Sequence, residues 1–267
     1  MKYFCSYIFL IFILFLCGCG GEGNVPAHKQ EAVQYKNSSM EISKNIKSLD
    51  ITADSANLKI YCWDKQEIKF EIKQIVRDNK LIVDLEKLLN KYYMTTKTEG
   101  NTLFFNVGFK GRIKKPEDIY SDIKLTVPRR MNNLKLSQKY GSFVVEDKFQ
   151  GNIEADIDSG DTEIKAMEGE LSYQCREGNI RLNSGKLLDN TKVDIKTGNI
   201  FIKTRCQEQG KYLFHTGTGN IDLSFPMESK IAFDSFGTVQ NNQFTGVDGD
   251  IDIKVSSEIG KISINGY

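Results

Sequence analysis

The chain has 267 residues, 40% of them hydrophobic and 27% charged, which is enough for one extended domain or two modest ones. Its 36 lysine and arginine residues nearly balance its 35 aspartate and glutamate residues. Because the net charge is close to zero, the chain lacks the overall basic field that would attract nucleic acid or an anionic membrane surface.

Residues 1–18 have the pattern of an export signal. Lys2 gives a basic start, and the apolar run Tyr7–Leu16 is too short to span a bilayer. The next residues, Leu16-Cys17-Gly18-Cys19, resemble a bacterial lipobox, which implies that Cys19 is lipidated. The alternative is an ordinary signal peptide with incidental cysteines. Residues 19–36 are then the lipidated cysteine and a flexible tether without periodicity.

Residues 37–130 predict a β-rich N-terminal part that carries one helix. Alternation of apolar and polar residues predicts strands near 46–51, 57–63, 67–73, 102–107 and 122–128. Between them, Leu81, Leu85, Leu88, Leu89 and Tyr92 recur at intervals of three and four. That spacing predicts an amphipathic helix of about four turns near 79–92, with Asp78 or Asn79 as its N-cap.

Residues 131–267 repeat one short phrase, in which glycine follows a polar residue and precedes a short alternating run. The phrase is centred on Gly141, Gly160, Gly178, Gly198, Gly219 and Gly260, with a weaker copy at Gly237. A period of roughly 20 residues indicates a solenoid, in which each rung is a strand, a tight turn at glycine and another strand. The predicted fold is therefore all-β, a β-solenoid similar to a parallel β-helix.

The alternation also predicts which side chains lie inside the solenoid. Ile157, Cys175 and Ile195 share one inward column, and Ile180, Ile200 and Ile221 share another. The residues between them, including Glu163, Arg181 and Asp222, point to solvent.

Three cysteines remain in the predicted mature chain besides Cys19, because Cys5 and Cys17 leave with the signal. They are Cys62, Cys175 and Cys206. The inward column of Cys175 predicts a buried, inert thiol. A Cys175–Cys206 disulfide stays open as an alternative without geometric support.

No motif in the sequence predicts a catalytic, metal or cofactor site. The two histidines, His28 and His215, form no His-x-x-x-His pair, and the sequence has no Cys-x-x-Cys and no Gly-x-Ser-x-Gly. Two acidic runs predict solvated strand faces, with weak Ca²⁺ binding as the alternative. They are Glu154, Asp156, Asp158 and Asp161 in one repeat and Asp248, Asp250 and Asp252 near the end.

A basic stretch predicts a loop tip, with contact to lipid headgroups or an anionic wall polymer as the alternative. Its residues are Lys110, Arg112, Lys114 and Lys115, with Arg129 and Arg130 nearby.

Several motifs in this order resemble the bacterial putative-adhesin family, whose members are β-strand-repeat proteins of unknown function. The motifs are Lys47–Ile51, Ser55–Ile60, Gly100–Leu103 and Ile123–Pro128, followed by the glycine phrases. The resemblance covers roughly residues 40–267, and the predicted helix looks like an insertion in the family pattern. It implies a β-solenoid on the outer side of a membrane and offers no catalytic residues.

We therefore expect a membrane-anchored extracytoplasmic lipoprotein that acts as a non-catalytic, adhesin-like binding or structural module at the cell envelope. Its partner would be an envelope protein or a polysaccharide, bound on a flat side or at the far end, where Gly260–Tyr267 should expose an unpaired last strand unless a cap or partner covers it. The alternatives are a β-helix enzyme acting on polysaccharide and a regulatory partner of envelope-stress membrane proteins. The short glycine spacing disfavours the enzyme, because it leaves no room for long groove-forming loops.

Overall fold

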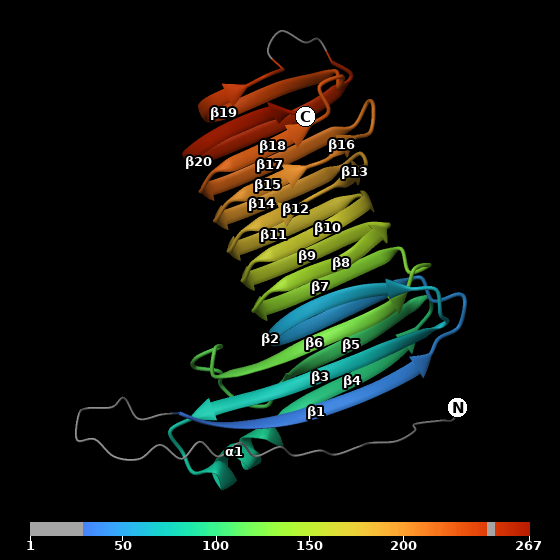
Figure 1. Ribbon diagram of the computed structural model, residues 1–267, viewed down its shortest axis with the longest axis vertical. Coiled ribbons are helices and arrows are strands. Elements are labelled where there is room, and N and C mark those ends of the chain that lie inside the picture. The colour runs from blue at the N-terminus through green and yellow to red at the C-terminus, as the bar shows by residue number, and fades with distance from the viewer. Residues whose placement is uncertain (1–28, 245–248) are drawn as a thin grey trace, which may run out of the picture.

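The computed structural model describes residues 29–244 and 249–267, and these form a tall stack of strands with one helix at its foot (Figure 1). The elements are β1 Gln30–Glu41, β2 Ser48–Trp63, β3 Glu67–Asp78, α1 Ile82–Leu89, β4 Tyr92–Glu99, β5 Thr102–Phe109, β6 Ile119–Pro128, β7 Asn133–Tyr140, β8 Phe143–Gln150, β9 Asn152–Ser159, β10 Thr162–Gly169, β11 Leu171–Glu177, β12 Ile180–Leu182, β13 Gly185–Leu187, β14 Thr191–Thr197, β15 Ile200–Lys203, β16 Arg205–Cys206, β17 Lys211–Thr218, β18 Ile221–Phe225, β19 Ile231–Asn242 and β20 Ile251–Gly266.

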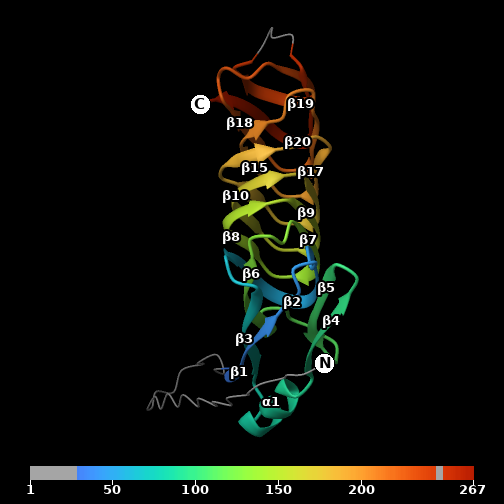
Figure 2. The ribbon, with the colours of Figure 1, turned by 90° about the vertical axis from the view of Figure 1, so that its right-hand side faces the viewer.

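Two parallel sheets face each other across the core, and a view turned by 90° shows them edge on (Figure 2). Face A contains the first half of β2, then β7, β9, β11, β14, β17 and the first half of β20. Face B contains the second half of β2, then β8, β10, β12 with β13, β15 with β16, β18 and the second half of β20. The predicted β-solenoid is thus confirmed.

Glycine is required at the corner where the chain passes from face A to face B. Gly198 has a φ of 149°, and a Cβ placed on it would lie 1.9 Å from the carbonyl oxygen of Gly178 in the rung before. The predicted turn at this phrase is therefore correct, but close approach of successive backbones adds a second reason for glycine. The Thr216 hydroxyl donates to the Gly198 carbonyl at 2.8 Å from inside the core, so that this corner carbonyl is not left unpaired.

Four residues that follow corner glycines build a ladder of side-chain hydrogen bonds between rungs: Asp161, Asn179, Asn199 and Asn220. The Oδ1 atom of Asn179 accepts hydrogen bonds from both the backbone N–H and the Nδ2 of Asn199, each at 2.9 Å. Asn179 donates in the same way to Asp161, and Asn199 accepts from the N–H of Asn220. The polar residue in the glycine phrase therefore ties neighbouring rungs together as well as favouring the turn.

The inward columns lie where the alternation predicts them. All six predicted core residues, Ile157, Cys175, Ile195, Ile180, Ile200 and Ile221, are buried. The register pairs Cys175 with Ile157 on one side and with Ile195 on the other. The predicted outward residues Glu163, Arg181 and Asp222 are half-buried or exposed.

Chain order and spatial order differ at two places in the stack. β2 lies between the β5–β6 rung and the β7–β8 rung, so an early segment belongs in the middle of the rungs. At the far end, β20 pairs with β17 and β18 on one side and with β19 on its other side. The expectation that Gly260–Tyr267 forms the exposed end is therefore wrong, because β19 is the terminal rung.

The inward residues of β20 explain this inversion. Val255 and Ile264 of β20 are buried in the core columns, whereas β19 places Ser235 and Asn242 opposite them. A strand with apolar inward residues gains more from being enclosed on both sides than a strand with polar ones. β20 therefore takes the interior place and β19 the end.

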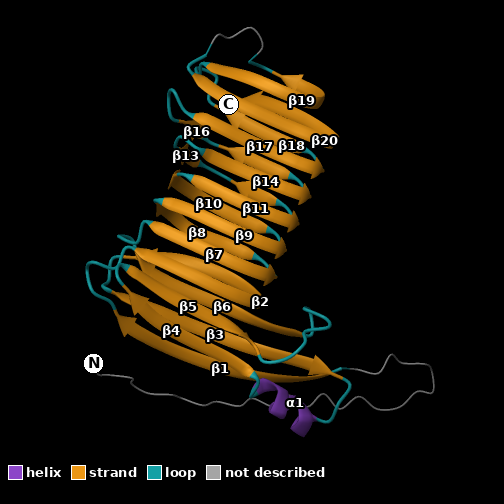
Figure 3. Ribbon diagram, turned by 180° about the vertical axis from the view of Figure 1, so that it is seen from behind, coloured by secondary structure: helices purple, strands orange, loops and turns teal. Residues whose placement is uncertain are grey.

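The foot of the stack is antiparallel and differs from the rungs. β3 pairs antiparallel with β1 and β6, and β4 pairs antiparallel with β5. The described residues contain one helix, α1, which lies beneath β1 when the molecule is seen from behind (Figure 3). Leu85 and Leu89 of α1 pack on Ala32 and Val76 in a small core of their own.

The helix occurs at the predicted place, but it is shorter and begins differently. Its N-cap is Leu81, which makes no side-chain capping bond, so neither Asp78 nor Asn79 caps it. Tyr92, which fits the helical spacing, belongs to β4 instead because its backbone pairs with Phe109. The Tyr92 hydroxyl lies 2.8 Å from the carbonyl oxygen of Ile75 and 2.9 Å from that of Tyr120, and donates towards both.

Candidate functional site

An open groove of about 360 Å³ crosses face A on the rungs nearer to α1. It runs over the first residues of β5, β2, β7, β9 and β11 and ends beside the turn before β14. The lining residues are Ser48, Leu49, Asp50, Thr102, Asn133, Leu134, Lys135, Asn152, Ile153, Glu154, Glu170, Ser172 and Asn190. Its size is at the lower end of ordinary ligand sites.

Three charged residues stand side by side in the groove on successive rungs. The register pairs Asp50 with Lys135 and Lys135 with Glu154. The Lys135 ammonium contacts Glu154 Oε1 at 2.7 Å, and this hydrogen bond raises the pKa of Lys135. Partial burial raises the pKa of Asp50, although the charge of Lys135 opposes this effect.

Amide side chains line the rest of the groove. Asn152 Oδ1 accepts a hydrogen bond from the N–H of Glu170 at 3.1 Å, and Asn133 Nδ2 donates to Asn132 Oδ1 at 3.1 Å. These bonds hold the amide planes in place, as preorganised binding groups require. The amides, hydroxyls and carboxylates of this groove can donate hydrogen bonds to a hydroxyl-rich ligand and accept hydrogen bonds from it.

The sequence analysis missed this groove, because no motif marks it. Its only sequence signal is weak: Asn133 and Asn152 both open a face A strand, about one repeat apart. The contribution of Ser48, Asp50 and Thr102 cannot be recognised in the sequence, because these residues reach the groove through the insertion of β2 between later rungs.

The predicted acidic runs are spread over different surfaces. Glu154 pairs with Lys135 in the groove, while Asp161 accepts hydrogen bonds from Asn179 at the glycine corner. Asp156 and Asp158 lie exposed on face A, and Asp248 is outside the described residues. In the part of the chain that the structure describes, no group of three or more His, Cys, Asp or Glu side chains could hold a metal ion.

His215 lies within β17, on the outer surface of face A. It stands between Asp194 and Ser256 in one column, and its Nδ1 is 2.8 Å from Ser256 Oγ. Asp194 instead lies 3.4 Å from the ammonium of Lys192. The three residues therefore form a row along a flat sheet and do not converge on a cleft; His28 is outside the described residues.

A family model described as Toastrack DUF4097 matches residues 25–265. The chain belongs to the Toastrack DUF4097 family. This confirms the resemblance to bacterial adhesin-like proteins of unknown function that the sequence motifs indicate.

Three solved structures that match the chain are distant from it in sequence. A putative cell adhesion protein from Clostridium sporogenes is 11% identical with a TM-score of 0.39, and the match covers 87% of this chain and 100% of that one. A putative adhesin from Parabacteroides distasonis is 10% identical with a TM-score of 0.39, over 87% and 97% of the two chains. A putative lipid binding protein from the same organism is 15% identical with a TM-score of 0.33, over 86% and 96%. No curated protein matches the chain.

The three cysteines within the described part of this Toastrack chain are free thiols, so Cys175 and Cys206 form no disulfide there. Cys62 and Cys175 are buried and Cys206 is half-buried. Burial raises the pKa of Cys62 to about 11 and that of Cys206 to about 12, and it also raises the pKa of Cys175. Thiols that remain protonated at neutral pH are poor nucleophiles.

The basic stretch divides into two parts. Lys110, Arg112, Lys114 and Lys115 are exposed on the loop between β5 and β6, as predicted. Arg130 is structural instead: its guanidinium donates to the carbonyl oxygens of Ile46, Ser43 and Ile42 at 2.7, 3.0 and 3.3 Å. Arg129 lies 3.3 Å from Asp64.

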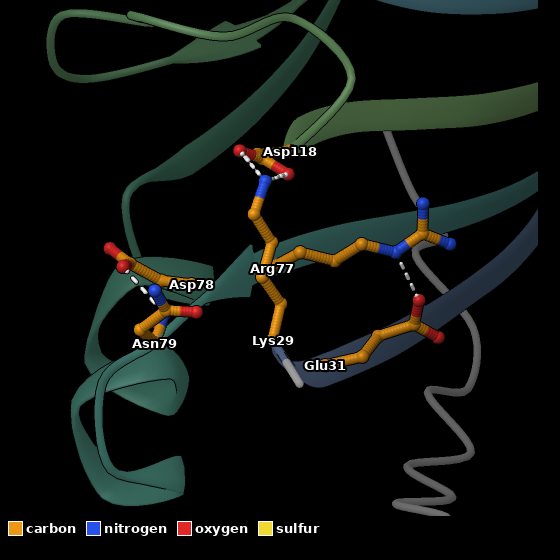
Figure 4. Close-up of polar contacts among 6 residues, drawn as sticks. All are labelled: Lys29, Glu31, Arg77, Asp78, Asn79 and Asp118. Carbon is orange, nitrogen blue, oxygen red and sulfur yellow. Dashed lines mark hydrogen bonds and ion pairs between the residues drawn. The ribbon is translucent and has the colours of Figure 1, made fainter. Parts of the chain in front are cut away.

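The described chain enters the Toastrack domain at the α1 end. The Lys29 ammonium contacts both carboxylate oxygens of Asp118 at 2.6 Å, and Arg77 contacts Glu31 at 2.5 Å (Figure 4). No helix in the described ranges is long and apolar enough to cross a membrane. Cys19, the predicted lipidation site, lies outside the described residues.

Proposed function

We propose that this protein is a lipid-anchored, extracytoplasmic and non-catalytic module that binds a hydroxyl-rich polysaccharide of the cell envelope in the groove on face A. The observation that carries the proposal is the lining of this groove, in which amides, hydroxyls and carboxylates recur on successive rungs. Rungs repeat at about 4.8 Å. A groove with regularly repeated polar groups suits a chain of repeated polar units better than a single compact ligand.

A second candidate function is hydrolysis of the same kind of polymer. Asp50 favours it, because a carboxyl group whose pKa is raised can act as a general acid, and Glu154 supplies a second carboxyl group two rungs away. However, Lys135 stands between the two in the column, and its ammonium contacts Glu154. It occupies the place that a reacting sugar or water would need, so binding without turnover is the better conclusion.

Removing groove side chains should weaken binding of soluble cell-wall polysaccharide, measured by isothermal titration calorimetry. We expect Asn152→Ala combined with Ser172→Ala to raise the dissociation constant about tenfold, because two lost hydrogen bonds contribute about 0.5–1.5 kcal/mol each. The matched control is Asn183→Ala with Ser224→Ala on face B, which should bind like the wild type. Equal affinity of the groove variant and the wild type would refute the site, and polysaccharide cleavage that Asp50→Asn abolishes would favour the enzyme.

Replacing Cys19 with alanine should abolish labelling by a fatty-acid analogue and move the protein out of the membrane fraction. The expectation rests on the lipobox-like sequence and on acyl chains, which contribute about 0.8 kcal/mol for each buried CH₂. Cys206→Ala serves as the control and should keep full labelling. Unchanged labelling of the Cys19 variant would exclude lipidation at this residue.

A further inference from the structure

The far end of the stack, made by β19 and the corner of β20, gathers exposed apolar side chains. Within the described residues, eight large hydrophobic side chains are exposed, and three of them, Phe236, Val239 and Ile259, belong to β19 or to the corner of β20. Phe236 and Ile259 are 71% and 68% exposed and lie at the corner where the chain passes between the faces. Exposed apolar groups gathered in this way mark an interaction surface.

The outer edge of β19 has no pairing partner among the described residues. In the described ranges β19 pairs with β20 alone, and the N–H and C=O groups on its other side pair with no strand there. The strand contains no proline and no lysine, and Asp234 is its only charged residue. Lysine, proline and bulging are the usual means by which proteins protect a sheet edge. β19 has neither lysine nor proline, and its register is irregular only between Phe236 and Thr238 and between Val239 and Asn241.

At the opposite end of the stack, the edge strand is protected, unlike the edge of β19. β1, the strand at that end, carries Glu31, Lys36 and Glu41, and α1 packs against it through Leu85 and Leu89. At the far end, the rings of Phe225, Phe233 and Phe244 close part of the core, with centroids 6.0–6.4 Å apart. Ser235 and Val239 remain exposed although they continue the inward columns over Val255 and Ile262. A further strand stacked on β19 would cover them.

We propose that this further strand is β19 of a second copy of the chain, paired antiparallel and head to head. β19 bends at Gly237 into two arms of similar length, 231–236 and 238–242. A twofold axis through this corner exchanges the arms and stacks one bent strand on the other. The same patch then meets itself, as a twofold interface requires.

The sequence of β19 is compatible with itself in this register. With Gly237 on the axis, Ser235 faces Val239 of the second copy, and both point into the core. Asp234 faces Gln240 of the second copy, so no like charges meet. The pairing also places Phe236 of each copy beside the axis, where its exposed ring becomes covered.

The head-to-head pair has a consequence that rests on the proposed lipid anchor. The described chain begins at the α1 end, so the two α1 ends would lie at opposite extremes of the dimer (Figure 1). Two anchored molecules would then be joined across the gap between two surfaces. Pairing itself needs neither the anchor nor the groove, so its failure would leave the proposed function untouched.

Self-association of the full-length protein in detergent is measured by sedimentation across micromolar concentrations. We expect a monomer–dimer equilibrium in the wild type, weakened at least tenfold by Phe236→Lys with Val239→Lys, which places four ammonium groups around the axis. Leu81→Lys with Val83→Lys at α1 is the matched control, because those residues are similarly exposed, and it should leave dimerisation unchanged. The proposal would be overturned if the wild type were a monomer at every concentration, or if the β19 substitutions left the dissociation constant of the dimer unchanged.

Disulfide formation tests the register. Ser235→Cys protein mixed with Val239→Cys protein should give a covalent dimer, because opposite residues of an antiparallel pair have Cα atoms about 4.5–5.5 Å apart, within disulfide range. Either variant alone should cross-link poorly, since its two cysteines would be about 13 Å apart along the strands at about 3.3 Å per residue. Equal cross-linking of the mixture and the single variants would contradict the pairing, and capture of a different protein in place of the second copy would identify another occupant.

Discussion

Gly198→Ala should lower the free energy of unfolding by more than about 4 kcal/mol, the range reserved for severe core or backbone damage. A Cβ at this position would lie 1.9 Å from the Gly178 carbonyl oxygen, and φ is 149°. The obstacle is backbone that is itself bonded to the next rung, so neither side can move away without breaking the stack. Urea unfolding followed by circular dichroism measures the change.

Gly100→Ala is the matched control for this prediction. Gly100 also has a positive φ, of 58°, but nothing lies within 4 Å of its added Cβ. Its substitution should therefore carry only the left-handed backbone cost of about 1–2 kcal/mol. If both variants lost the same unfolding free energy, the need for glycine at the corners would come from its conformational freedom alone. Close packing of the rungs would then play no part.

Ile200→Ala should cost about 2–5 kcal/mol of unfolding free energy, as other large truncations in a core do. Ile200 is fully buried, and it is stacked between Ile180 and Ile221 in its column. Neighbouring rungs are held at a fixed spacing by their backbone hydrogen bonds, so the column cannot collapse into the cavity. Thermal and urea unfolding should agree on the loss.

The control for Ile200→Ala is a change on the adjacent outward column. Asp222 is half-buried, and its Oδ1 accepts a hydrogen bond from Asn265 Nδ2 at 2.9 Å. Asp222→Asn keeps an acceptor oxygen there, so stability should change by no more than about 0.5 kcal/mol. Equal losses for the two variants would mean that the inward and outward assignments of this rung are incorrect.

The parts of the structure that could be predicted from the sequence are those set by neighbouring residues. Alternation along one strand determines which side chains share a face, and this places Ile180, Ile200 and Ile221 inside. The place of the helix is also predicted, because apolar spacing is local, but α1 is shorter at both ends than the predicted range 79–92. Tyr92 fits the helical pattern, but ladder pairing with Phe109 holds it in β4.

The candidate site could not be predicted in the same way. Asp50, Lys135 and Glu154 become neighbours because β2 lies against β7 and β7 against β9. No pattern around Asp50 indicates which later strand it will meet. Only the pairing of whole strands brings these three side chains into one column.

By itself, the sequence determined that the chain is a solenoid, where its corners lie and which residues fill its core, because glycine, alternation and period act over a few residues at a time. The tertiary structure alone decided the order of rungs at two places in the stack. A strand edge can accept any strand whose inward residues suit the neighbouring column, and this choice is made by burial rather than by position in the chain. Val255 and Ile264 bring β20 inside and leave β19 at the end with its edge open, just as β2 enters the middle of the stack and completes the groove.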